Sequence, residues 1–230
     1  MTNYLITPTL LNSLKYYLGS EYSKREDFLK TLSREKFEPN EAMQKGIDFE
    51  NDIENYCNNN FEPSYIKRTI TYRYGGGGSL AGDFWYDEDE KEEFFIDNYS
   101  QSVINCGNIV KGGFWQESVK KEIKVAGIKF LLYGRCDVIK NDTIFDIKYT
   151  KNYNVGKFTD STQHLIYMYC SGLSKFQYLV SDLKSFWIEE YQSEKNIESK
   201  IISEIFSFLD YLDRDSEAKK LFYSKWESKY

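Results

Sequence analysis

The sequence lacks any apolar segment long enough to cross a membrane. Its longest apolar run, residues 128–133, is interrupted by Lys129 and is far shorter than the roughly 20 residues that a transmembrane helix needs. The first residues also lack the basic segment, the apolar stretch and the cleavage site of a secretory signal. Both absences exclude membrane and secreted classes, and we expect a cytoplasmic protein.

Cysteine is scarce and widely spaced. The 4 cysteines are Cys57, Cys106, Cys136 and Cys170, and no two of them lie within four residues of each other. This pattern contains no zinc-binding spacing, and an iron–sulfur site would need all four cysteines to converge through the fold. We therefore expect free, buried thiols in a reducing compartment, and no iron–sulfur cluster.

The chain also lacks an excess of positive charge. Its 30 Lys and Arg stand against 36 Asp and Glu, so the formal net charge is -6 and nothing draws the chain to nucleic acid at long range. A local basic groove remains compatible with this balance in an enzyme that also needs carboxylates. Hydrophobic residues make up 41% and charged residues 29%, which predicts one folded domain over residues 1–230.

The order of predicted elements is typical of a mixed fold. Thr7 and Pro8 supply an N-cap and a first helical residue, and Gly19 ends that helix. We predict further helices at about 24–36, 41–57, 161–171, 197–212 and 216–227, and strands at about 65–73, 116–125, 129–140, 143–149, 176–181 and 185–191. This order predicts an α/β (mixed α+β) fold with a central mixed β-sheet flanked by helices.

Residues 74–112 interrupt this pattern and predict an insertion or a flexible loop. Four glycines and Ser79 form a run at 75–79 that is typical of a flexible or engineered linker. A phosphate-binding loop would need a Lys followed by Ser or Thr, and Leu80 follows instead. The acidic residues at 87–93 predict a solvated turn between strands.

A predicted two-residue hairpin turn at 141–142 places two aspartates side by side. Counting back from this turn along both strands, Asp137 lies directly opposite Asp146, and Lys148 follows two residues later on the same face. Facing like charges are destabilising, and a divalent cation held by both carboxylates would compensate for them. The alternative is an ordinary hairpin whose polar face meets water.

Four motifs in sequence resemble those of the PD-(D/E)XK nuclease superfamily. Gly-x-x-Asp at 134–137, followed after eight residues by Asp-Ile-Lys at 146–148, resembles its core motif. The RecB-type branch adds Gly-x-x-x-Glu on an upstream helix, here at 46–50, and Gln-x-x-x-Tyr on a downstream helix, here at 163–167. The opening segment at 6–11 also resembles the first helix of that branch.

The resemblance implies a restriction-endonuclease-like PD-(D/E)XK core and a Mg²⁺- or Mn²⁺-dependent deoxyribonuclease. Asp137, Asp146 and Glu50 would hold the metal ion, with the Ile147 carbonyl completing the ligand set. Lys148 would orient or deprotonate the attacking water. The upstream histidine and the iron–sulfur cysteines of some relatives are missing here. A catalytically silent module that binds nucleic acid or protein is the alternative, although such a module has no physical need of facing carboxylates.

The upstream helix itself favours Glu50 over Asp48 as a ligand. At about 100° per residue, the apolar residues between 43 and 57 form one arc that includes Glu50 and Glu54 and excludes Asp48. A carboxylate buried in that arc needs a charged partner or a metal ion. We expect Glu54 either to contact the metal-binding residues without binding the ion itself or to reach solvent.

Residues around this core predict contacts with a DNA strand. Gln163 and Tyr167 lie one helical turn apart and would position the strand and the reacting groups, or would simply pack in the core. His164 points away from Gln163, and we expect it to be structural or exposed. Glu122 resembles the acidic position on the first core strand of the superfamily. Candidate phosphate contacts are Lys120, Lys121, Lys124, Lys151 and Lys157, each alternatively part of a solvated face.

The resemblance further implies DNA with free ends as the substrate, degraded exonucleolytically in phage recombination or replication, with a recombination or single-strand-annealing protein as a possible partner. The low net charge favours a narrow groove in which a few lysines hold a strand, and Tyr149, Tyr153 and Tyr167 would stack on bases or belong to the core. An endonuclease of the same fold is the alternative. Strand polarity, the choice between DNA and RNA, and the oligomeric state stay open.

Overall fold

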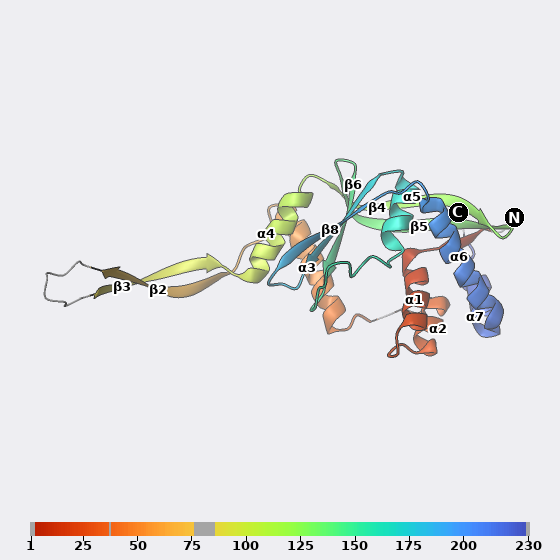
Figure 1. The fold of residues 1–230 in the computed structure, drawn as a ribbon, viewed down its shortest axis with the longest axis horizontal. Helices are drawn as coiled ribbons and strands as arrows, with labels where there is room; N and C mark the ends of the chain where they lie inside the picture. Colours follow the sequence, from red (N-terminus) through yellow and green to blue (C-terminus); the bar gives the residue numbers. More distant parts are fainter. Residues whose placement is uncertain (1–2, 37, 76–85, 229–230) are drawn as a thin grey trace.

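The computed structural model describes residues 3–36, 38–75 and 86–228, and its elements are labelled in Figure 1. The strands are β1 (Tyr4–Ile6), β2 (Tyr65–Gly75), β3 (Tyr86–Ile96), β4 (Phe114–Val125), β5 (Ile128–Lys140), β6 (Thr143–Tyr149), β7 (Lys175–Ser181) and β8 (Phe186–Gln192). The helices are α1 (Pro8–Gly19), α2 (Arg25–Ser33), α3 (Glu41–Cys57), α4 (Asn98–Val110), α5 (Gln163–Ser171), α6 (Ile197–Arg214) and α7 (Ser216–Lys225).

The central sheet is mixed, as the sequence predicts. Its six strands follow the order β1-β5-β6-β7-β8, with β4 paired along β5. β1 pairs with β5, and β6 with β7, in parallel, whereas the other pairs are antiparallel. With helices on both faces, the predicted class of a mixed α/β fold around one central sheet is confirmed.

One edge of β5 is shared by two strands and is left open between them. β1 pairs with residues 130–132 and β6 with residues 138–140, while β4 covers the other edge over nearly the whole strand. Residues 133–137 therefore have no strand partner on the side of β1 and β6. Polar groups on this stretch need partners from elsewhere, and the candidate site forms here.

Helices cover the two faces of the sheet and enclose separate cores (Figure 1). α1, α2, α5, α6 and α7 pack on one face, where Leu10, Phe28 and Phe208 are at most 1% exposed. α3 and α4 pack on the opposite face through Phe49 and Val103, both fully buried. Strand alternation explains the division, because adjacent residues of β6 and β7 contribute to different cores.

Local signals place the helix starts where the sequence predicts them. The Thr7 side chain accepts a hydrogen bond from Leu10 N at 3.2 Å, and Pro8 opens α1. Asn40 caps α3 in the same way, through Met43 N at 2.9 Å. No helix in the described part of the chain is both long and apolar enough to span a membrane.

The segment 74–112 differs from the expectation of a loop wherever the structure describes it. The acidic residues 87–93 belong to β3, which pairs residue by residue with β2, so the predicted turn is wrong. The two strands form an arm that extends away from the body (Figure 1). Charges on both faces of such an arm are solvated, so the sequence shows no apolar alternation there. Residues 76–79 of the predicted linker lie outside the described residues.

Helix α4 is also absent from the prediction, although the sequence contains its signals. Asp97 caps the helix by accepting a hydrogen bond from Ser100 N at 2.7 Å. Val103, Cys106 and Val110 follow at helical spacing and are fully buried against α3. The glycine-rich and acidic segment at residues 75–93, which precedes α4, makes this short amphipathic pattern hard to recognise in the sequence.

Candidate functional site

The hairpin between β5 and β6 forms as predicted near its turn. Asn141 and Asp142 adopt positive φ angles of 48° and 60°, the backbone that a tight two-residue hairpin turn requires. Lys140 pairs with Thr143, and the ladder continues for two more pairs to Val138 and Phe145. The predicted register is correct over these three pairs.

The next predicted pair, Asp137 with Asp146, is not part of the ladder. Asp137 instead turns its carboxylate to the backbone of the partner strand, where Oδ2 accepts a hydrogen bond from Ile147 N at 2.8 Å. On its other edge β6 pairs with β7 along its whole length, where Asp146 lies beside Tyr178. The two strands separate here, yet Asp146 stays close enough that its charge, after burial, raises the pKa of Asp137.

Asp146 is fully buried and is held by two side chains. Lys148 Nζ lies 2.5 Å from Asp146 Oδ2, and the Lys148 side chain is 32% exposed against 1% for Asp146. Gln163 Nε2 donates a hydrogen bond to the other oxygen, Oδ1. The predicted arrangement of Asp146 and Lys148 on one face is therefore present, and Gln163 from α5 joins them.

Glu50 reaches the same place from α3, which covers the other face of the sheet. Its carboxylate is half-buried and accepts a hydrogen bond from Gln116 Nε2 at 2.6 Å. Asp48 is exposed and Glu54 half-buried, as the helix geometry predicts. Gln116 is a site residue that the sequence reasoning missed. The pairing register of β4 with β5 would reveal it, because Gln116 lies between the two residue pairs that flank Asp137.

These groups form a cluster with unbalanced charge. Burial and the charge of Asp146 raise the pKa of Asp137 well above its usual range. Burial and the charge of Asp146 likewise raise the pKa of Glu50. Burial lowers the pKa of Lys148, but the charges of Asp146 and Asp137 outweigh it and keep this pKa above its usual value. Three carboxylates against one ammonium leave two negative charges, so additional positive charge would stabilise the ionised site.

The donors suit a hard divalent cation in chemistry and charge. Carboxylate oxygens and a backbone carbonyl are the ligands that Mg²⁺ and Mn²⁺ prefer, and among the described residues the Lys148 ammonium is the one partner of the buried Oδ2 of Asp146. Within residues 3–36, 38–75 and 86–228, however, no three His, Cys, Asp or Glu side chains converge closely enough to hold an ion. Lys148 and Gln116 engage the carboxylates in this arrangement.

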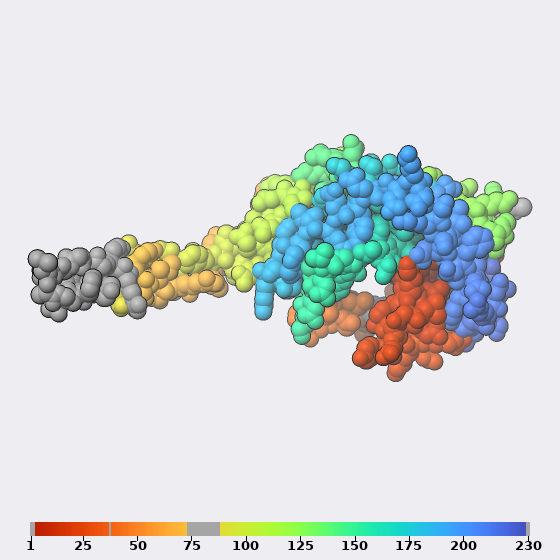
Figure 2. All heavy atoms as spheres, in the orientation of Figure 1, coloured from red at the N-terminus to blue at the C-terminus, as the bar shows by residue number. Residues whose placement is uncertain are grey.

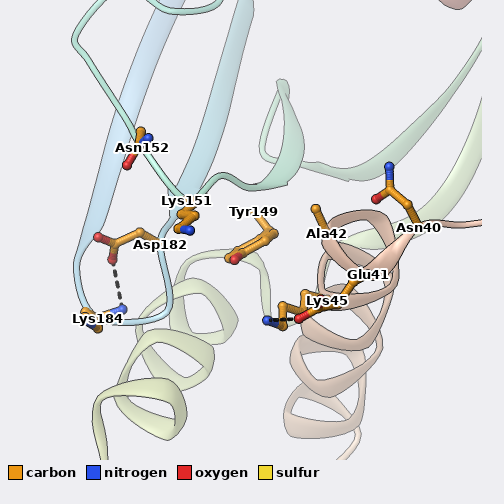
Figure 3. Close-up of a pocket in the computed structure, with 9 residues that line it drawn as sticks. All are labelled: Asn40, Glu41, Ala42, Lys45, Tyr149, Lys151, Asn152, Asp182 and Lys184. Carbon is orange, nitrogen blue, oxygen red and sulfur yellow. Dashed lines mark hydrogen bonds and ion pairs between the residues drawn. The ribbon is translucent and has the colours of Figure 1, made fainter.

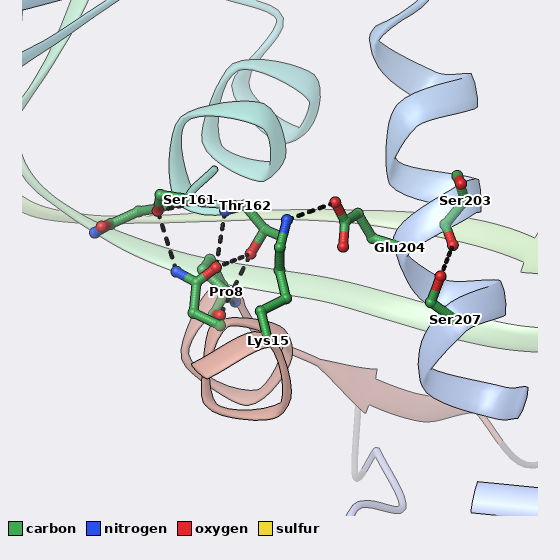
Figure 4. A network of polar contacts seen from close by, with 9 residues as sticks. Pro8, Lys15, Ser161, Thr162, Ser203, Glu204 and Ser207 are labelled. Atoms are coloured by element: carbon green, nitrogen blue, oxygen red, sulfur yellow. Dashed lines mark hydrogen bonds and ion pairs between the residues drawn. The ribbon is translucent and has the colours of Figure 1, made fainter. Parts of the chain in front are cut away.

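A polar contact between α1 and α5 positions Gln163. Thr162 N and Oγ1 both donate to Asn12 Oδ1, at 2.8 and 2.9 Å, and Asn12 Nδ2 donates to Ser161 Oγ at 3.1 Å. Figure 4 shows this network at the start of α5, with the Lys15–Glu204 ion pair beside it. The first turn of α5 is thereby fixed to α1, and Gln163 is the first residue of that helix.

Tyr167 crosses the open edge of β5 and depends on Gly134. Its hydroxyl donates to Arg135 O at 2.8 Å and lies 3.3 Å from Gln163 Nε2. A Cβ added at Gly134 would lie 2.1 Å from the Tyr167 ring, so only glycine admits the ring. At Gly46, by contrast, an added Cβ would meet Tyr149 Cβ at an ordinary 3.7 Å. Tyr167 is 6% exposed, which favours its reading as a core and positioning residue over base stacking.

Two cavities lie near the end of β6, and one of them is lined by residues of the cluster. One, of about 630 Å³, is lined by Lys148, Gln163, Lys157, Lys15 and Tyr16, among others. The other, of about 660 Å³, lies beside Tyr149 at the end of β6, and Figure 3 shows Lys45, Lys151 and Lys184 around it. In the space-filling view an opening is visible between α1, α3 and the segment that follows β6 (Figure 2). Lys157 therefore lines the same cavity as Lys148 and Gln163, whereas Lys151 lines the cavity beside Tyr149.

Other predicted residues lie away from the cluster. Glu122 is exposed, pairs with Leu131 and accepts a hydrogen bond from Asn3 Nδ2 at 3.2 Å, so it is not near Asp137. Lys121 lies over the Tyr169 ring at 3.8 Å, and Lys120 and Lys124 share that distal half of β4. Linear spacing did not reveal this separation, because β4 and β5 are both long and only one end of their ladder reaches the site.

His164 and the cysteines are parts of the core. His164 is 5% exposed, and its ring stacks on Tyr191 with centroids 4.1 Å apart, which agrees with a structural role. All four cysteines are free, with Cys106 and Cys136 buried and Cys57 and Cys170 half-buried. Burial raises the pKa of the Cys136 thiol to about 12, so this thiol stays protonated and unreactive.

Comparison with known proteins gives no family for this chain. No protein-family model matches it, and no curated protein matches it. Part of the chain is similar to a solved structure described as "Crystal structure of SSO0001", with 18% sequence identity and a TM-score of 0.39. The match covers 47% of this chain and 55% of that one. A likeness of this size supports no inference about function.

Proposed function

We propose that this protein is a Mg²⁺- or Mn²⁺-dependent deoxyribonuclease of the PD-(D/E)XK superfamily, RecB-type branch. The observation that carries the proposal is the gathering of Asp137, Asp146, Glu50 and Lys148 at the open edge of β5. A buried carboxylate cluster is costly and contributes little to stability. Its position beside a cavity lined by Lys148, Lys15 and Lys157 favours a catalytic role.

The side chains divide the work of phosphodiester hydrolysis. Asp137, Asp146 and Glu50, with the Ile147 carbonyl, would hold the divalent cation, which when bound lowers the pKa of a water and offsets charge on the phosphate. Lys148 pairs with Asp146 and lines the adjoining cavity, where its ammonium would orient the attacking water and face the oxygens of the phosphate. Gln163 fixes the Asp146 carboxylate, and Tyr167 fixes the backbone of β5.

The surroundings favour a single strand entering from an end. An opening lies between α1, α3 and the segment after β6 (Figure 2), and lysines line one cavity beside Lys148 and another beside Tyr149. A frayed strand would be held by Lys157 in the cavity beside Lys148 and by Lys151 in the cavity beside Tyr149. We therefore propose an exonuclease acting on free DNA ends in the cytoplasm, in phage recombination or replication.

A second candidate function has its own observation. The Lys148–Asp146 ion pair and the absence of a converged ligand set among the described residues suit a module that binds nucleic acid without cutting it. In that case Lys148 serves only to neutralise Asp146. The two candidates differ in a simple way, because only the nuclease needs a divalent cation for its effect on DNA.

The decisive experiment is a digestion of matched DNA forms. Linear, nicked and covalently closed circular DNA of one sequence are incubated with the protein in Mn²⁺, in Mg²⁺ or in excess chelator. We expect loss of the linear form from its ends with metal, an intact closed circle, and no reaction with chelator. Equal cutting of circle and linear form would indicate an endonuclease with the same site. Metal-independent binding without cleavage would support the silent module and refute the nuclease.

A further inference from the structure

The arm formed by β2 and β3 is a sheet without cover. It has two strands only, and at about 3.4 Å per residue its eleven-residue register spans roughly 35 Å. Neither strand pairs with the central sheet, and the arm extends away from the body (Figure 1). Isolated two-stranded hairpins are marginally stable in water, and long free edges invite pairing with another chain.

Apolar side chains are exposed on both faces at the base of the arm. Phe94 and Tyr65 are 68% and 59% exposed on one face, and Phe95 and Ile66 are each 36% exposed on the other. The register confirms this division, because Ile66 pairs with Phe95 while their neighbours point the other way. The base therefore offers an apolar surface on either side of the β3 edge.

Carboxylates occupy the rest of β3. Five of its residues from 88 to 93 are acidic, and the sixth is Lys91, which lies over the Tyr72 ring at 5.7 Å. Glu92 pairs with Lys67 at 2.6 Å, and Glu93 accepts a hydrogen bond from Tyr72. Asp89 and Glu90 are exposed and form no ion pair with the described residues. The distal part of the β3 edge is thus negatively charged.

The negative charge of β3 argues against two classes of partner that could pair along its edge. Nucleic acid would be repelled by the row of carboxylates on β3. A second copy pairing β3 with β3 about a two-fold axis would bring these same acidic rows together. Pairing β2 of one copy with β3 of another would match the charges but would not close, and would give open-ended fibres.

We propose that the β3 edge of the arm binds an extended segment of a protein partner. The segment is apolar where it meets Phe94 and Phe95, and it carries Lys or Arg where it meets Asp89 and Glu90. Backbone pairing along the free edge supplies affinity, and the apolar end and the basic stretch set register and direction. This interaction is separate from the proposed nuclease activity and does not require it.

The test uses synthetic peptides on the full chain. One peptide alternates Lys and Thr and ends in Ile-Val-Ile, a second has the reversed order, and a third replaces Lys with Glu. We expect one lysine peptide to bind with micromolar affinity by fluorescence anisotropy and to slow amide hydrogen exchange at 88–96. The glutamate peptide should not bind. Failure of both lysine peptides to bind or to protect 88–96 overturns the proposal.

Matched variants locate the interaction. Asp89→Lys with Glu90→Lys should weaken peptide binding at least about tenfold, as should Phe94→Ser. Glu21→Lys with Glu26→Lys, which changes the net charge equally on an exposed part of the body, should leave binding unchanged. Equal loss in both charge variants would mean nonspecific attraction. Two outcomes would refute the proposal. If light scattering shows a dimer that Phe94→Ser abolishes, the partner of the arm is a second copy of the chain. If the protein binds DNA and Lys67→Glu with Arg68→Glu abolishes this binding, the partner is DNA.

Discussion

Two antiparallel hairpins in this protein carry acidic residues, and their surroundings give those residues opposite properties. In the β5–β6 hairpin, Asp146 is 0% exposed and is held by Lys148 and Gln163. In the β2–β3 arm, Asp89 and Glu90 are exposed and without an ion pair to the described residues. The first hairpin lies inside a six-stranded sheet covered by helices, whereas the second is a two-stranded sheet that no helix of the described residues covers.

The difference shows that a run of acidic residues says little by itself. The arm has more carboxylates, yet Asp89, Glu90 and Glu92 are exposed and are not brought together by burial. The β5–β6 hairpin has only two, but burial brings them together with Glu50 and raises the pKa of each carboxyl group in the cluster. We therefore expect catalysis at the β5–β6 hairpin, where the sheet buries the carboxylates, and binding of a partner at the β2–β3 arm, where the carboxylates are exposed.

Catalysis gives the largest expected contrast. Asp146→Asn or Lys148→Ala should reduce metal-dependent cleavage by about 10²–10⁴-fold, because each removes a group acting on the reacting water or its metal ion. Asp142→Asn is the matched control, since Asp142 occupies the left-handed turn of the same hairpin, where Asn is tolerated. Initial rates with circular dichroism spectra check this. Unaltered rates in both site variants would break the assignment.

His164 shows how burial acts on a side chain that becomes positively charged when it is protonated. Burial lowers its pKa from 6.5 to about 4 in the folded state, so the unfolded state binds more protons between these values. Stability contributed by the neutral imidazole is therefore present above pH 6.5 and is lost as pH falls toward 4, by about 3 kcal/mol in total.

Urea unfolding of wild type and His164→Phe, from neutral pH to about pH 4, measures this effect. The free energy of unfolding should fall more steeply with falling pH in the wild type than in the variant. A difference between the two proteins that stays constant with pH would contradict the burial of a neutral imidazole.

Divalent metal should distinguish the two hairpins in a stability assay. Mn²⁺ at about 100 times its dissociation constant should stabilise the wild type by about 2.7 kcal/mol, because only the native state gathers the three carboxylates. Asp137→Ala should lose this gain, and Asp89→Asn with Glu90→Gln should keep it. A gain that follows the arm variant instead would place the ion on the arm. Thermal melts with and without Mn²⁺ provide the measurement.

Glycine substitutions test the packing that keeps the β5 edge open. Gly134→Ala should destabilise the fold by about 1–3 kcal/mol, since its Cβ would lie 2.1 Å from the Tyr167 ring. Gly46→Ala should stabilise α3 by up to about 1 kcal/mol, because its Cβ meets only an ordinary contact at 3.7 Å. Chemical denaturation of both variants checks the pair. Equal effects would show that Tyr167 does not rest on Gly134.

The smallest effect is expected on the arm. Glu90→Gln removes an exposed charge that pairs with no described residue, so the free energy of unfolding should change by less than about 0.5 kcal/mol and cleavage should not change. Denaturation and digestion assays on this variant beside Asp146→Asn complete the comparison. A large loss of stability or activity would mean that the arm contacts the body or the substrate.

The sequence by itself determined most elements of the body, except β1 and α4, and the chemical groups of the site except Gln116. Caps at Thr7 and Asn40, apolar periodicity and the turn at Asn141 depend on neighbours within a few residues, so local physics is sufficient for them. The same holds for Asp146 and Lys148, which lie on one face of a short strand, and for Gln163 and Tyr167, one turn apart on a helix.

Only the tertiary structure decided which groups meet. The ladder stops before Asp137 because β1 and β6 share one edge of β5, a division that depends on strands far apart in the sequence. Other placements also depend on contacts between residues far apart in the sequence. Gln116 contacts Glu50, and Asn12 fixes the start of α5. Glu122 lies at the distal end of β4. The acidic strand β3 escaped prediction because a hairpin solvated on both faces has no apolar alternation, and alternation appears in a sequence only where a sheet buries one face.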